Sequence, residues 1–210
     1  MHTNNPYAHA GWPNPRNLDP GSIPQAAHSP YLTMGPIVDP IRQRRPISIL
    51  TLTFLFKGLE KGEGILNSVV YGPHGHTYLD VGTNSNVTTL IRMSGLFAEI
   101  HWSASGTGTW LKAPGVCSPM LASSFLELSP DGGYRIMRFN GNKFFWEAKV
   151  DATYMYKLLT DTSTLEIARL EINEDCNAAV LEISMDNFEE GIVQRAIISA
   201  VLLYGGRSFD

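Results

Sequence analysis

The chain has 210 residues, of which 43% are hydrophobic and 17% are charged, and its formal net charge at pH 7 is −4. This length and apolar share suffice for one compact domain with a sizeable core. The negative net charge excludes a general attraction to nucleic acid, so we expect no nucleic-acid partner.

The first 46 residues differ in composition from the rest of the chain. They hold 9 of the 13 prolines and show no hydrophobic periodicity. Such a segment cannot bury enough apolar surface to offset its ordering entropy, so we predict that residues 1–46 are a disordered or extended arm. Arg42, Arg44 and Arg45 lie where the arm joins the domain. They are candidate ligands for anionic lipid headgroups, and a solvated hinge is the alternative interpretation.

From residue 47 onward the sequence has the pattern of β-strands. The first segment, Ile47–Phe56, is rich in β-branched and aromatic residues, which favour strands. Evenly spaced short strands predict a sandwich or an up-and-down barrel. The further strand-like segments are Asn67–Tyr71, His76–Val81, Val87–Met93, Leu96–Ser103, Thr107–Leu111, Met120–Leu128, Tyr134–Phe139, Lys143–Val150, Thr153–Thr160, Leu165–Glu171 and Ala178–Ser184.

The dipeptide Asn140–Gly141 predicts a two-residue type I′ hairpin. In that register Arg138 lies opposite Lys143, and Arg135 lies opposite Trp146. Like charges that face each other are unfavourable unless an anion or an acidic neighbour relieves them. Arg138 and Lys143 are therefore candidates to receive a phosphate, with Arg135 stacked on Trp146 by a cation–π contact. Neutralisation by a carboxylate on a neighbouring strand is the alternative, and it is the commoner situation for surface charges.

The segment Asp186–Gly206 is the clearest helix. From Ile192 to Tyr204 its apolar residues lie on every side, so the helix must be buried on every side, in a core or in a membrane. The largely apolar run Ala196–Tyr204, in which Ser199 is the one polar residue, has 9 residues. A bilayer span needs about 20, so we predict a core helix and no transmembrane span. Asp186 is a suitable N-cap, with Glu189 in the capping-box position.

These two observations combine into one architecture. A sheet of about twelve antiparallel strands can close into a barrel that is too wide for its own side chains to fill. A helix that is apolar on every side would fill it. The sequence therefore predicts a mainly β domain over residues 47–210, an antiparallel barrel that encloses a central helix near residues 186–204.

This arrangement resembles the tubby C-terminal-like superfamily, which includes tubby proteins, LURP-one-related proteins and phospholipid scramblases. The segments ISILTLTF, AEIHW (Ala98–Trp102), NGNKFFWE (Asn140–Glu147) and RAIISAVLLY (Arg195–Tyr204) resemble most an uncharacterised single-domain family of mushroom-forming fungi. The resemblance covers residues 47–206 and implies a twelve-stranded barrel around the helix. Tubby domains bind phosphoinositides through basic exterior residues, but none of their site motifs matches here. The cysteine cluster and the calcium-binding segment of scramblases are also missing.

The search for catalytic chemistry is negative. The sequence has no Walker A, G-x-S-x-G or H-E-x-x-H motif, and we predict no catalytic residue, metal or cofactor. His74 and His76 can be part of a metal site or of a plain turn. Cys117 and Cys176 can form one disulfide or remain buried thiols. No secretory signal is visible, so we expect a cytoplasmic or other intracellular protein, with peripheral membrane attachment as an option.

We therefore expect a non-enzymatic binding module that contacts a protein partner or an anionic, phosphoinositide-like membrane surface. A carrier of a small hydrophobic ligand and an enzyme of unrecognised type are the alternatives. The carrier requires an open interior. The enzyme requires a cluster of titratable residues inside the barrel.

Overall fold

The computed structural model describes residues 48–57, 64–103, 108–160, 163–173, 177–186, 189 and 191–210. The predicted arm, with Arg42, Arg44 and Arg45, lies outside the described residues, as does Cys176. No helix in the described part of the chain is long and apolar enough to cross a membrane.

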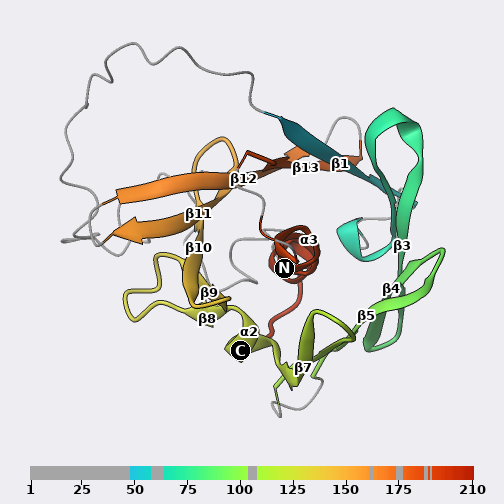
Figure 1. Ribbon diagram of the computed structural model, residues 1–210. Helices are drawn as coiled ribbons and strands as arrows, with labels where there is room; N and C mark the ends of the chain where they lie inside the picture. Colours follow the sequence, from blue (N-terminus) through green and yellow to red (C-terminus); the bar gives the residue numbers. More distant parts are fainter. Residues whose placement is uncertain are drawn as a thin grey trace.

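One antiparallel sheet of thirteen strands forms the body of the molecule, and Figure 1 shows it curled around the C-terminal helix α3 (Ile192–Tyr204). The strand order in the sheet is β7-β6-β5-β4-β3-β2-β1-β13-β12-β11-β10-β9-β8. The bounds are β1 (Ile49–Phe56), β2 (Ser68–Tyr71), β3 (Thr77–Asn84), β4 (Val87–Arg92), β5 (Gly95–His101), β6 (Trp110–Ala113), β7 (Cys117–Leu121), β8 (Glu127–Leu128), β9 (Arg135–Phe139), β10 (Asn142–Ala148), β11 (Thr153–Thr160), β12 (Ser163–Asn173) and β13 (Ala178–Ser184).

The two edge strands, β7 and β8, are consecutive in the chain but do not pair with each other. The one-turn helix α2 (Ala122–Phe125) joins them. Twelve antiparallel steps separate β7 from β8 in the sheet, so the two strands run in the same direction. The prediction of a single strand over Met120–Leu128 is wrong. Residues Ala122 to Phe125 form one helical turn, in which Ala122 and Phe125 are buried. The mainly β class and the C-terminal helix are confirmed, whereas the sheet is not closed by hydrogen bonds.

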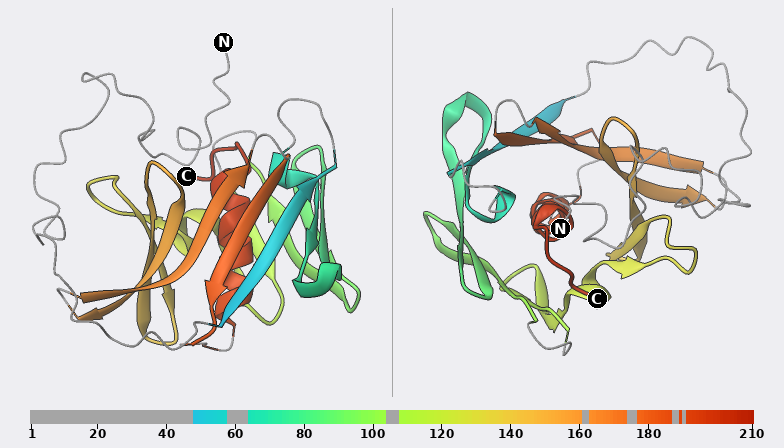
Figure 2. Two further views of the ribbon diagram at one scale, coloured as in Figure 1. Left: turned by 90° about the horizontal axis from the view of Figure 1, so that it is seen from above. Right: turned by 180° about the vertical axis from the view of Figure 1, so that it is seen from behind.

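Antiparallel pairing places successive turns alternately at two ends of the sheet. We call the end at which β1 and α3 begin the proximal end; it holds the turns at residues 72–76, 93–94, 114–116 and 140–141. The distal end holds the turns at 85–86, 129–134 and 149–152, and α3 ends there (Figure 2). Two contacts of α3 and its C-terminal extension fix this direction. Arg195 binds the carbonyl of Val116 in a proximal turn, and Arg207 binds that of Ser85 in a distal turn.

The interior is filled by apolar side chains of the sheet and of α3. On β1 and β10, alternate residues such as Leu52, Phe54, Phe144 and Trp146 point inward and are at most 1% exposed. The prediction that the helix is buried on every side is confirmed for the residues from Ala196 to Tyr204. Each fully buried Leu or Ile side chain contributes about 1.5–3 kcal/mol to stability. Helix and sheet therefore stabilise each other.

The predicted start of the helix is wrong. Helix α3 begins at Ile192, after Gly191 in the left-handed conformation with φ 92°. A Cβ on Gly191 would lie 3.0 Å from the Phe139 ring. Both the positive φ and this close contact therefore favour glycine at this position. Asp186 does not cap the helix, because its carboxylate accepts a hydrogen bond from the Ser48 amide at 3.2 Å. The Glu189 carboxylate instead pairs with Lys157.

The predicted hairpin is confirmed. Asn140 and Gly141 have φ values of 49° and 74°, as a type I′ turn requires, and Asn142 pairs with Phe139. Arg138 faces Lys143 in this register.

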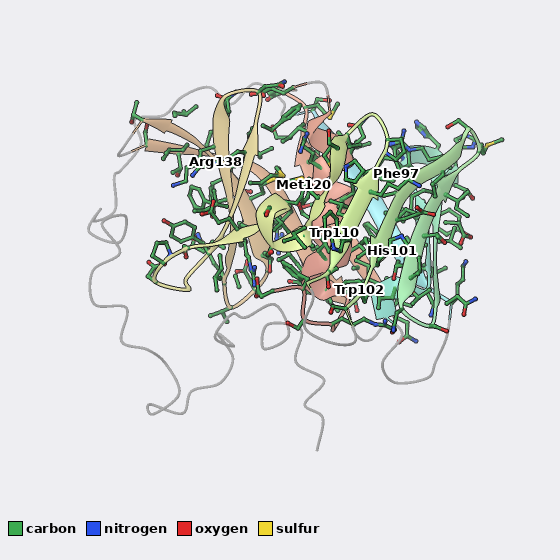
Figure 3. All side chains as sticks on the ribbon, turned by 90° about the horizontal axis from the view of Figure 1, so that it is seen from below. Phe97, His101, Trp102, Trp110, Met120 and Arg138 are labelled. Carbon is green, nitrogen blue, oxygen red and sulfur yellow. The ribbon has the colours of Figure 1, made fainter. Side chains whose placement is uncertain are left out.

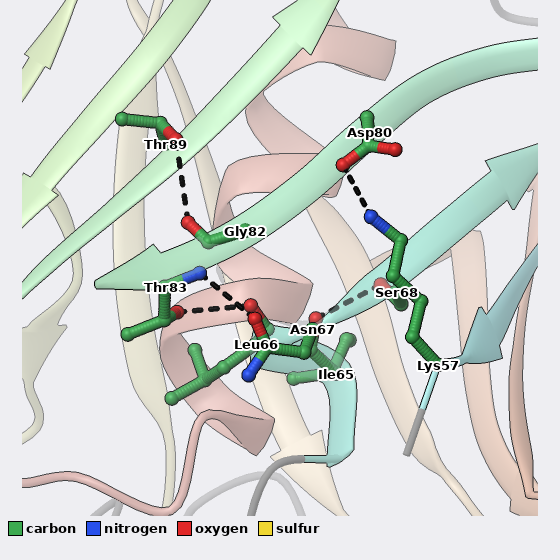
Figure 4. A network of polar contacts seen from close by, with 9 residues as sticks. All are labelled: Lys57, Ile65, Leu66, Asn67, Ser68, Asp80, Gly82, Thr83 and Thr89. Atoms are coloured by element: carbon green, nitrogen blue, oxygen red, sulfur yellow. Dashed lines mark hydrogen bonds and ion pairs between the residues drawn. The ribbon is translucent and has the colours of Figure 1, made fainter. Parts of the chain in front are cut away.

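A second local arrangement fixes the connection between β1 and β2. The carbonyl of Leu66, at the end of the 3₁₀ turn η1 (Gly64–Leu66), accepts a hydrogen bond from the Thr83 hydroxyl at 2.9 Å (Figure 4). The Thr83 amide donates to Oδ1 of Asn67 at 2.9 Å, and the Ser68 hydroxyl donates to the Ile65 carbonyl at 2.9 Å. These bonds satisfy polar groups beside the core, so we assign them a structural role.

Candidate functional site

The described interior contains few polar or charged side chains. Its buried polar or charged residues are almost all hydroxyl-bearing, with one exception, Arg135. No group of three or more His, Cys, Asp or Glu side chains within the described ranges could hold a metal ion. His74 and His76 are exposed at the 3₁₀ turn η2 (Pro73–Gly75).

Arg135 belongs to a structural contact at the distal end. Its guanidinium is fully buried and holds both carboxylate oxygens of Asp210, with Nη1–Oδ1 at 2.7 Å and Nη2–Oδ2 at 2.5 Å. Nη1 also donates to the Leu126 carbonyl at 3.1 Å, and the guanidinium lies 4.4 Å from the centre of the Phe209 ring. This ion pair fastens the segment after α3 to strand β9.

The expectation that Arg135 joins Arg138 in an outer anion site needs correction. Residues three apart on a strand point to opposite faces of the sheet, so Arg138 points outward where Arg135 points inward. Arg135 does face Trp146 in the register, as predicted, but its guanidinium contacts the ring of Phe209. Its charge is balanced by Asp210 and its side chain is buried, so Arg135 is not a ligand of the outer surface.

Arg138 and Lys143 remain outward neighbours, with different surroundings. The Arg138 side chain is 68% exposed and lies 3.9 Å from Oε2 of Glu127 on β8. The predicted alternative, an acidic neighbour, thus applies to Arg138. Lys143 has no carboxylate within ion-pair distance among the described residues, and its Nζ lies 6.0 Å from the centre of the Tyr134 ring.

At the proximal end, three cations have no carboxylate partner among the described residues. The structure describes eleven Lys and Arg residues, and seven of them pair with carboxylates. The four that form no such pair are Arg92, Lys143, Arg195 and Arg207. The first three lie at the proximal end, at the end of β4, the start of β10 and the first turn of α3.

Arg195 is the one charged residue of α3. Its Nη2 donates to the Val116 carbonyl, its guanidinium lies 4.3 Å from the centre of the Phe139 ring, and its Nε is buried without a hydrogen bond. Burial lowers the pKa of Arg195. Burial also raises the pKa of the nearby Cys117 thiol, and the Arg195 charge opposes that rise. A half-buried charge without a counter-charge destabilises a fold, so we infer that Arg195 is present for a reason other than stability.

Arg92, the last residue of β4, also lies over aromatic rings. Its guanidinium lies 4.0 Å from the centre of the Phe97 ring and 5.3 Å from that of Tyr78. Nε and Nη2 of Arg92 are buried without a hydrogen-bond partner. In Figure 3, Phe97 and Arg138 lie toward the same end of the sheet and Trp102 lies toward the other.

Exposed apolar side chains gather at the same end. Eight large hydrophobic residues are exposed in the described part of the chain, and five of them lie at or beside the proximal turns. Met93, at the tip of the β4–β5 hairpin, is 100% exposed. The proximal five are Ile49, Ile91, Met93, Leu96 and Leu159, and the other three are Leu55, Trp110 and Val150.

We define the proximal site as these five apolar residues together with Arg92, Lys143 and Arg195. Guanidinium and ammonium groups without counter-charges can bind phosphate oxygens, and the exposed apolar side chains can enter hydrocarbon. Of these residues the sequence analysis named only Lys143 as a ligand. It named Arg195 only as the first residue of the segment RAIISAVLLY, and it placed Ile91 and Met93 within a strand.

Comparison with protein-family models gives no match, and comparison with curated proteins gives none. Among solved structures, one match is a domain from Vibrio parahaemolyticus assigned provisionally to outer membrane lipoprotein sorting. The two chains are 12% identical, and the match covers 70% of this chain and 91% of that one, with a TM-score of 0.19. A similarity of this size carries no argument about fold or function.

Proposed function

We propose that the protein is a non-enzymatic binding module that attaches to anionic membrane surfaces through the proximal site. One observation carries this proposal. The end that holds three of the four described cations without carboxylate partners also holds five of the eight exposed large hydrophobic residues. Apolar insertion together with positive charge is the combination that peripheral membrane proteins use.

The hairpin tip supplies the apolar part. Met93 has no packing partner to lose, so its insertion into the acyl region gains up to about 2 kcal/mol. Ile91 and Leu96 stand beside it in the β4–β5 hairpin and can follow it to the level of the headgroups. A tip of three apolar residues gives reversible binding rather than permanent anchoring.

The cations supply the electrostatic part. Each Lys or Arg near an anionic leaflet contributes about 1 kcal/mol. Strand β1 begins at the proximal end, so the sequence brings Arg42, Arg44 and Arg45 within a few residues of the same end. We propose that these arginines, which lie outside the described residues, strengthen the attachment.

We also propose that the fold is the tubby C-terminal-like barrel suggested by the sequence. The curl of the thirteen-stranded sheet around α3 supports this proposal, because its two edge strands, β7 and β8, are joined by the single helical turn α2. The filled interior gives less support to a hydrophobic-ligand carrier.

Co-sedimentation of the full chain with vesicles tests the membrane proposal. We expect binding to phosphatidylcholine vesicles that contain phosphatidylserine, and much weaker binding to phosphatidylcholine alone. Met93→Ser should lower the affinity by about tenfold, the equivalent of 1.4 kcal/mol. Val150→Ser is the matched control, because Val150 is an exposed apolar residue of a distal turn, and it should bind as the wild type does.

Two outcomes would refute the proposal: no binding to the anionic vesicles, or equal affinities for Met93→Ser and the wild type. A double variant, Arg92→Gln with Lys143→Gln, should reduce the dependence of binding on salt concentration, because both residues interact with lipid by charge. Vesicle binding that depends on neither charge nor Met93 would mean that another surface of the protein contacts the lipid.

A further inference from the structure

A row of aromatic side chains crosses the outer face of β9, β10 and β11. The ring centres of Tyr134 and Phe145 are 5.5 Å apart, those of Phe145 and Tyr156 are 5.3 Å apart, and those of Tyr156 and Tyr154 are 6.1 Å apart. All four residues are partly exposed. We call these residues the aromatic row.

The described chain does not cover this row. Helix α3 lies on the inner side of the sheet, and Figure 1 shows no described helix outside β10 and β11. Lys149 lies at one end, where its Nζ donates to the Tyr156 hydroxyl at 2.7 Å and is 5.1 Å from the centre of the Tyr154 ring. The Tyr154 hydroxyl donates to Asp151 at 2.5 Å. Tyrosines whose hydroxyl groups are already hydrogen-bonded offer the apolar surface of their rings to a partner. Their side chains are rigid, so binding costs little conformational entropy.

The predicted arm contains a segment that matches this surface. Residues 30–40, PYLTMGPIVDP, are the most apolar part of the arm and include three prolines. Proline-rich segments lose little conformational entropy when they bind, and they dock on surfaces lined by aromatic residues. An apolar segment and an aromatic row that no described helix covers, both in one chain, are a complementary pair.

The connection between the two is short enough. Strands β13 and β12 lie between β1 and β11, so three strand spacings of about 4.8 Å separate the start of the domain from the row. Residue 40 is eight residues before Ser48, and an extended chain spans about 3.1 Å per residue. The tether therefore reaches β11 and gives the segment a high effective concentration there.

We propose that residues 30–40 of the arm dock on the aromatic row of their own chain. The contact is separate from the proximal site and does not depend on the membrane proposal. Docking keeps the arm against the domain and covers apolar surface that would otherwise be open to another partner.

Limited proteolysis of the full chain by subtilisin, with cleavage positions mapped by mass, tests the docking. We expect cleavage within residues 30–40 to be about tenfold faster in Tyr156→Ala than in the wild type, the factor for loss of one aromatic anchor. Trp110→Ala is the matched control, because Trp110 is an exposed aromatic residue on another part of the sheet. It should be cleaved at the wild-type rate. Thermal unfolding shows whether Tyr156→Ala is folded, and Tyr154→Ala serves as a second variant of the row.

Equal cleavage rates in the wild type and in both row variants would overturn the proposal. Protection that increases with protein concentration would also overturn it, because the occupant would then be a second copy of the chain. No vesicles are present in this assay, and Tyr156 lies outside the proximal site. A failure of the docking proposal therefore leaves the membrane proposal standing, and the reverse also holds.

Discussion

The two ends of the sheet differ in how arginines that lie over aromatic rings inside the fold are paired. At the distal end, Arg135 is fully buried and holds Asp210, while Lys149 lies 3.6 Å from Glu147. At the proximal end, Arg92 and Arg195 also lie over aromatic rings, yet no carboxylate in the described part of the chain pairs with them. A paired buried charge fastens one segment to another, whereas an uncompensated charge is open to an external anion. The distal end therefore stabilises the fold, and the proximal end is the candidate for binding.

The largest effect should come from the element that the two ends share. Ile197→Asp places a carboxylate on a fully buried position of α3, so we expect the loss of the folded domain. Far-ultraviolet circular dichroism and one-dimensional NMR measure this. Ser199→Ala, at another buried position of the same helix, is the control and should remain folded. A soluble, folded Ile197→Asp variant would contradict the central position of α3.

Removing the distal counter-charge should have the next largest effect. Asp210→Ala removes the carboxylate that the buried Arg135 guanidinium holds, so we expect a loss of about 3 kcal/mol in the free energy of unfolding. Urea unfolding followed by tryptophan fluorescence measures it. Vesicle binding of the folded fraction should not change. An unaltered unfolding midpoint would mean that the Arg135–Asp210 ion pair does not stabilise the fold.

The same kind of change at the proximal end should not destabilise the protein. Arg195→Met removes an uncompensated charge and keeps apolar volume against Phe139, so we expect a change within about 0.5 kcal/mol, or a gain. Vesicle affinity should fall in the same variant. A loss of 2 kcal/mol or more, with binding intact, would give Arg195 the structural role that we assign to Arg135.

The smallest effect concerns the thiol beside Arg195. Burial raises the pKa of Cys117, so less of the reactive thiolate is present at pH 8 than for a free cysteine. Alkylation of Cys117 by iodoacetamide, in a Cys176→Ser background, should therefore be slow. Its rate should continue to rise to a higher pH than the alkylation rate of a free cysteine does. Arg195→Met removes the charge that lowers this pKa and should slow the reaction further. Faster alkylation in that variant would show that the charge does not act on the thiol.

The sequence predicted the parts of the fold that depend on local pattern. Alternating apolar residues located the strands, and Asn140–Gly141 gave the hairpin and its register. It did not predict the break between β7 and β8, because the segment reads as one strand, whereas Ala122 to Phe125 form a single helical turn with Ala122 and Phe125 buried. The helix start was missed because Glu189 pairs with Lys157, which is distant in sequence.

The candidate site was less predictable than the fold. Lys143 was found because its neighbour across the hairpin is fixed by the turn. Arg135 was misassigned because its partner Asp210 is 75 residues away, and no local sequence pattern indicates that the two residues pair. Arg92 and Met93 carry no motif at all. Their significance comes from what the fold leaves unpaired and exposed at one end, which requires the tertiary structure.

The most direct test of the membrane proposal is the depth of the hairpin tip on a vesicle. An environment-sensitive fluorophore on Met93→Cys, in a Cys117→Ser and Cys176→Ser background, reports contact with hydrocarbon, and the same fluorophore on Val150→Cys reports the distal end. We predict a blue shift for the residue 93 label on phosphatidylserine vesicles, with quenching by brominated acyl chains, and neither change for the residue 150 label. Equal responses of the two labels, or a response at residue 150 alone, would contradict attachment through the proximal end.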